Sequence, residues 1–134
     1  MFIAGSTPKS NDSTRSLAAR AEERFFTLDH VGVVRHFEGV DLDRVVSSLG
    51  EMVGAQGRKV EQATEDLRGR LVHTCVVEPW QSEPLILWLT ATQVEGVGVV
   101  VDAKIFHPTE QSAEADEELS RLMGDLERRI TTHL

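Results

Sequence analysis

A run of three predicted strands between residues 70 and 106 constrains the fold of this chain most. The last two strands are separated only by Glu95-Gly96, a two-residue connection typical of a tight hairpin. In the final strand one face is wholly apolar and the other is mixed, as in an antiparallel sheet with one packed and one partly wet face. The three predicted strands are Arg70–Glu78, Leu85–Val94 and Val97–Phe106.

Three further segments place apolar residues three and four positions apart, which predicts helices with one apolar face. The first begins near Ser13, the second follows Asp41 as its N-cap, and the third begins at Thr109 or Ser112. In the third, acidic residues gather at the start and arginines near the end, which matches the helix dipole. The apolar stripes are Leu17, Ala21 and Phe25; Leu42, Val45, Val46, Leu49, Met52 and Val53; and Leu119, Leu122, Met123, Leu126 and Ile130.

Two shorter segments complete the pattern. Residues 27–37 alternate with a two-residue period and predict a strand whose better apolar face carries Val31, Val33 and Phe37. Residues 58–68 fit either a second helix or an edge strand. We expect the helix, because the few apolar residues of this segment are three and four positions apart.

Together these elements predict an α+β fold, in which amphipathic helices pack on a mainly antiparallel sheet of about four to five strands. A long C-terminal helix ends the chain. We expect residues 13–134 to form a single domain and residues 1–12 to be a disordered tail. The element order from Leu28 to Leu134 resembles the helix-grip layout of START and Bet v 1-like lipid-binding domains. That resemblance implies a cavity for an apolar ligand beside the C-terminal helix.

The charge balance excludes several classes of protein. With 14 Lys and Arg against 22 Asp and Glu the net charge is -8, which disfavours binding to nucleic acid through phosphate neutralisation. One cysteine excludes an intrachain disulfide framework, and the apolar runs are too short to span a bilayer. The first 21 residues are basic and rich in Ser and Thr, as organelle transit peptides also are. We expect a cytoplasmic protein, with an organelle-targeted N-terminus as the minor alternative.

His73 and Cys75 are the closest His/Cys pair in the sequence. On a strand these positions share one face at roughly 6–7 Å, close enough to share a metal or for the imidazole to activate the thiol. A zinc site takes three or four ligands, and a free cysteine is most often buried. A wider site built from His36, His73 and His107 has no ligand-spacing motif. We therefore expect no metal and no cofactor.

The sequence contains no P-loop and no Gly-x-Ser-x-Gly nucleophile elbow. Asp102 and Lys104 share a face of the last predicted strand, where we expect an ion pair on the wet side of the sheet and no acid–base function. No catalytic residue is predicted.

Trp80 and Trp88 are the two tryptophans, and both lie near the connection from Pro79 to Pro84. If the neighbouring leucines face the core, Trp88 lies on the second face of the sheet, where it would line a pocket or meet a partner. If helices cover both faces, Trp88 is ordinary core. The candidate binding residues are Trp80, Trp88, His73 and Cys75.

Two functional classes remain open. The first is a non-enzymatic protein-interaction domain, acting as an adaptor, a chaperone-like protein or a homodimeric scaffold. The alternative is a helix-grip-like domain that binds a small apolar ligand, or a cavity enzyme. The missing catalytic motifs favour the first class, and a protein partner or self-association is expected.

Overall fold

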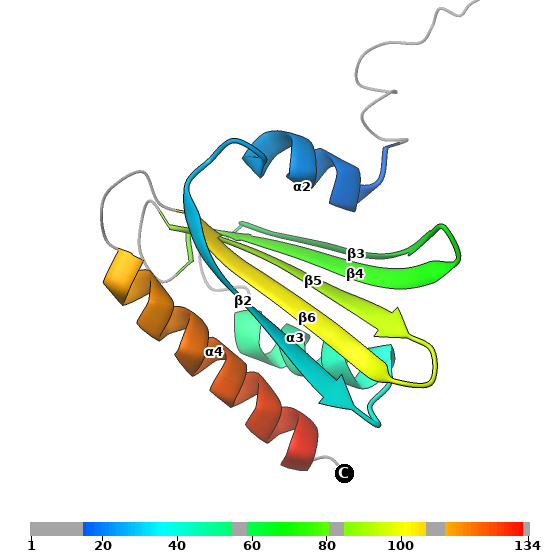
Figure 1. The fold of residues 1–134 in the computed structure, drawn as a ribbon. Coiled ribbons are helices and arrows are strands. Elements are labelled where there is room, and N and C mark those ends of the chain that lie inside the picture. Colours follow the sequence, from blue (N-terminus) through cyan, green and yellow to red (C-terminus); the bar gives the residue numbers. More distant parts are fainter. Residues whose placement is uncertain (1–14, 55–58, 81–84, 107–111, 133–134) are drawn as a thin grey trace, which may run out of the picture.

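The computed structural model describes residues 15–54, 59–80, 85–106 and 112–132 (Figure 1). It has three helices and five strands in these ranges, which confirms the predicted α+β class. None of the described helices is long and apolar enough to cross a membrane. The expected tail at residues 1–12 lies outside the described residues. In chain order the elements are α2 (Leu17–Phe25), β2 (His30–Glu38), α3 (Leu42–Val53), β3 (Lys59–Leu67), β4 (Arg70–Glu78), β5 (Ile86–Val94), β6 (Gly98–Phe106) and α4 (Ser112–Thr132).

The sheet is antiparallel throughout, with the strand order β2-β6-β5-β4-β3. Strands β3 to β6 follow one another as a meander. β2 comes first along the chain but pairs with the last strand, from His30 opposite Phe106 to Glu38 opposite Gly98. This topology leaves β2 and β3 as the two edges of the sheet.

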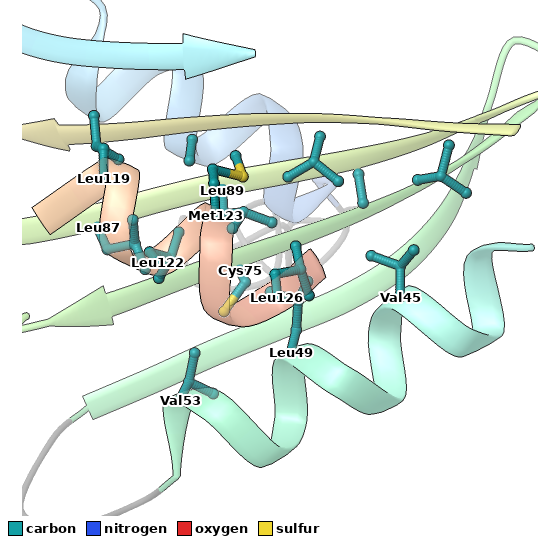
Figure 2. Close-up of a cluster of buried hydrophobic side chains, with 14 of the residues drawn as sticks. Val45, Leu49, Val53, Cys75, Leu87, Leu89, Leu119, Leu122, Met123 and Leu126 are labelled. Atoms are coloured by element: carbon teal, nitrogen blue, oxygen red, sulfur yellow. The ribbon is translucent and has the colours of Figure 1, made fainter. Parts of the chain in front are cut away.

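α3 and α4 lie on one face of the sheet, which we call the core face, and α2 lies on the other (Figure 1). Figure 2 shows Val45 and Leu49 of α3 and Leu126 of α4 meeting Cys75 and Leu89 of the sheet. All five side chains are fully buried. Each such aliphatic side chain contributes roughly 1.5–3 kcal/mol of transfer free energy, so this layer supplies most of the stability.

A smaller cluster joins α2 to the other face, which we call the second face. Phe25 stacks on Phe106 with ring centroids 4.8 Å apart and lies 5.7 Å from the ring of Trp88. The carboxylate of Glu65 on β3 accepts hydrogen bonds from the backbone N–H groups of Leu17 (2.9 Å) and Ala18 (3.4 Å). A tertiary contact therefore supports the first turn of α2 in addition to its N-cap Ser16.

The helix predicted over residues 58–68 is wrong: this segment is the edge strand β3. Half-buried and exposed residues nearly alternate along this segment, and none is fully buried. Near-alternation is typical of a strand at the edge of a sheet, whereas an amphipathic helix buries residues three and four positions apart. β3 turns into β4 through Arg68 and Gly69, both with positive φ (57° and 83°), as a two-residue hairpin of type I′ requires.

The hairpin between β5 and β6 is one residue longer than predicted. Val94 pairs with Gly98, so Glu95, Gly96 and Val97 form the loop. Gly98 has a φ of 142°, and a Cβ there would overlap the carbonyl oxygen of Phe37 on β2. A glycine is therefore needed at the start of β6, opposite Glu38 of β2.

Candidate interaction surface

His73 lies on the core face of β4, 4 % exposed, and both ring nitrogens contact side chains of β3. Nδ1 lies 2.8 Å from Oγ1 of Thr64, and Nε2 lies 3.0 Å from Oε1 of Gln62. Desolvation by burial lowers the pKa of the imidazole below its ordinary value. The arrangement fits a neutral ring that donates from Nε2 to Gln62 and accepts the hydroxyl proton of Thr64. His73 is thus bound within the sheet and has no ring nitrogen left for a ligand.

Cys75 is two residues away on the same face, as the spacing predicts, but it is fully buried. Burial raises the pKa of its thiol to about 12. A cysteine of this kind stays protonated near neutral pH, and the thiolate is the form that attacks electrophiles or binds metals. The pair of His73 and Cys75 therefore has neither the access nor the ionisation for nucleophilic chemistry.

The structure does not bring His36 to His73. His36 lies on β2 and His73 on β4, with β6 and β5 between them, which at the usual spacing is about 14 Å. His107 lies outside the described residues. In the part of the chain that the structure describes, no group of three or more His, Cys, Asp or Glu could hold a metal ion.

The two tryptophans lie on opposite faces of the sheet. Trp80, 4 % exposed, belongs to the core cluster beneath α3 and α4, and its backbone N–H donates to the carbonyl oxygen of Leu85 (2.7 Å). Trp88 is half-buried on the second face, where the ammonium of Lys104 lies 5.0 Å from the indole centroid. Trp80 is thus an anchor of the core, whereas Trp88 has one side against α2 and another near the surface.

Lys104 also forms an ion pair of 3.0 Å with Asp102 on the second face. Both side chains are about one-third exposed, so the pair is screened and contributes little to stability. The prediction of a wet-face ion pair is confirmed.

A hollow of about 470 Å³ lies on the second face beside α2. Its walls include Ala18 and Glu22 of α2 and Trp88 and Thr90 of β5. It is open to solvent, and Ser16, Asp66 and Arg68 also line it. Trp88 is thus one wall of this hollow.

The second face beyond this hollow is not packed against a described helix. Val34 of β2 is its most exposed apolar residue, at 62 %. Its neighbours belong to neither of the two buried clusters, and Figure 1 shows α2 alone among the helices on this side of the sheet. We call this region the open face; its residues are Val34, His36, Thr92, Val94 and Val100.

The two edges of the sheet differ in charge. β3 carries Lys59, Glu61, Glu65 and Asp66 among its nine residues, a common protection of an edge against pairing with another chain. The middle of β2 is Val31-Gly32-Val33-Val34, with no charge and no proline. Among the described strands, the edge of β2 therefore offers an uncharged run of backbone groups that no other described strand pairs with.

The sequence predicts contact through a sheet face or edge near the tryptophans, but it does not single out Val34. The two-residue alternation places Val34 on the second face of its strand, but whether a helix covers that face depends on where α2 docks. Gln62 and Thr64, the partners of His73, were missed because their segment was assigned to a helix.

Comparison of this chain with protein-family models, with curated proteins and with solved structures finds no match.

Proposed function

We propose that this chain is a non-enzymatic protein-interaction domain whose binding surface is the open face together with the free edge of β2. The observation that carries the proposal is Val34, a valine that is 62 % exposed at the centre of a strand whose core side is half-buried. Apolar side chains exposed on a continuous surface commonly mark contact sites.

The chemistry of the candidate residues supports a binding role over a catalytic one. A catalytic histidine or cysteine needs access to a substrate and a suitable ionisation. His73 and Cys75 are buried and uncharged, and Trp80 lies within the core. None of the three presents a reactive group at the surface.

The alternative function, a helix-grip-like binder of an apolar ligand, requires a cavity between the sheet and α4. Side chains occupy that layer, among them Leu126 and Met123 of α4 (Figure 2). These two residues, and Ala103 and Ile105 of β6, each have 0 % exposed surface. This close packing favours the interaction domain.

Site-specific photocrosslinking in living cells tests the proposal. A photoreactive amino acid replaces Val34 or Val100 on the open face and, as a matched control, Leu71, an aliphatic strand residue that is 47 % exposed on the core face. We expect protein adducts of defined mass at Val34 and Val100 and none at Leu71. Adducts at no position, or equal adducts at all three, would contradict the proposal.

A further inference from the structure

We infer that the partner of this surface is a second copy of the chain, joined by antiparallel pairing of the two β2 strands into one continuous sheet. This inference rests on the proposed function and names the occupant of its surface.

The regularity of β2 is the first argument. It pairs with β6 residue for residue from His30 to Glu38, without a bulge, while its outer edge pairs with no described strand (Figure 1). A long, unbulged edge without proline is a template for another strand. Its nine residues would supply a full antiparallel ladder to an identical neighbour.

Symmetry then determines the register. Two identical strands that overlap completely in an antiparallel pair meet at their midpoint, so Val34 lies opposite Val34 on the two-fold axis. His30 lies opposite Glu38 at both ends of the pair, and each Gly32 lies opposite His36. The imidazole ring of His30 thus meets a carboxylate, and the ring of His36 meets a residue without a side chain.

Antiparallel pairing of two β3 strands would, by contrast, be unfavourable. Its midpoint is Ala63, and full overlap would place Glu61 opposite Glu65 twice. Like charges directly opposite one another destabilise a strand pair. Both carboxylates also already bind α2, Glu61 through Arg20 (2.9 Å) and Glu65 through the first turn. Self-pairing therefore selects β2 and rejects β3.

The one charged residue near the middle of β2 does not oppose this arrangement. Arg35 points to the core face, where its Nη1 lies 3.1 Å from Oε1 of Glu127 on α4. Its charge is compensated within its own copy. On the second face, pairing of the two β2 strands brings the two exposed Val34 side chains together. The open faces of the two copies then form one continuous surface.

Disulfide trapping of the purified full chain tests both the contact and its register. In Val34→Cys the two new thiols face each other at about 4.5–5.5 Å between Cα atoms, within reach of a disulfide. In His36→Cys, on the same strand and face, the two thiols are four residues out of register, about 13 Å apart. Under mild oxidation we expect a covalent dimer for Val34→Cys and monomer for His36→Cys, while the buried Cys75 stays reduced.

Charge variants give a second, reversible readout. Glu38→Lys places a lysine opposite His30 at both ends, so we expect roughly tenfold weaker dimerisation in sedimentation velocity. Combining it with His30→Glu places a glutamate opposite each lysine and should restore the affinity. Loss of dimer in the double variant as well would contradict the register.

A single species of 14.9 kDa at all concentrations, or equal crosslinking of Val34→Cys and His36→Cys, would overturn the inference. The proposed function would survive that result if the photocrosslinker at Val34 still captured a different protein. It would fail separately if Val34 gave no adduct in cells.

Discussion

At the scale of the residue, His73 shows how burial changes the meaning of a polar side chain. A two-residue spacing correctly places His73 and Cys75 on one face of β4. It does not reveal that this face is the core face, nor that Gln62 and Thr64 on the next strand bind both ring nitrogens. What resembles half of a metal site in the sequence is a hydrogen-bonded link between an edge strand and its neighbour.

The lowered pKa of His73 makes the stability of the protein depend on pH. The imidazole is held neutral in the folded state but takes up a proton near pH 6.5 when the chain unfolds. Its contribution to stability is therefore present above pH 6.5 and is lost as the pH falls below that value. Urea unfolding between pH 5 and pH 8 should show this loss, and His73→Gln should reduce the slope. An unchanged slope in that variant would contradict the assignment.

The raised pKa of Cys75 predicts slow chemistry at the only thiol of the chain. A disulfide reagent at pH 8 should label the native protein only as fast as it opens, because a thiolate forms and becomes accessible mainly in opened molecules. In denaturant the same reagent should react at once. Rapid labelling of the native protein would show that Cys75 is accessible and ionised.

At the scale of the element, β3 marks the limit of what periodicity can predict. A long apolar stripe, such as that of α4, is enough to predict a helix from the sequence, because only a helix places so many of these residues on one face. β3 has few apolar residues, and its conformation depends on pairing with β4 along its full length and on a turn through Arg68 and Gly69. These are tertiary and turn effects that override weak local preference.

Glu65 of β3 has a testable role in holding α2. Removing its carboxylate leaves the N–H groups of Leu17 and Ala18 without their acceptor, at a cost of about 1 kcal/mol, typical of a lost helix cap. In Glu65→Ala we expect faster hydrogen exchange throughout α2 and unchanged exchange in β5 and β6. Glu61→Gln, which removes only the exposed pair with Arg20, is the control and should have little effect.

At the scale of the whole molecule, helix coverage divides the sheet into unequal halves. The apolar stripes of α3 and α4 predict the main core well, since their residues are those found buried against the sheet. The open face is the part of the second face that α2 leaves uncovered, because α2 is short. No local pattern contains that information, because it depends on strand order and on where one helix docks.

This division predicts two different responses to truncation. Leu126→Ala removes a fully buried side chain of the main core and should cost roughly 2–5 kcal/mol of global stability, seen as an equal rise in exchange rate for the slowest amides of every strand. Phe25→Ala removes the anchor of α2 on Trp88 and Phe106 and should release mainly that helix. In a Trp80→Phe background, the fluorescence of Trp88 should then shift to the red and become accessible to iodide. If Phe25→Ala instead accelerated exchange uniformly, α2 would be an integral part of the main core and not a separately releasable helix.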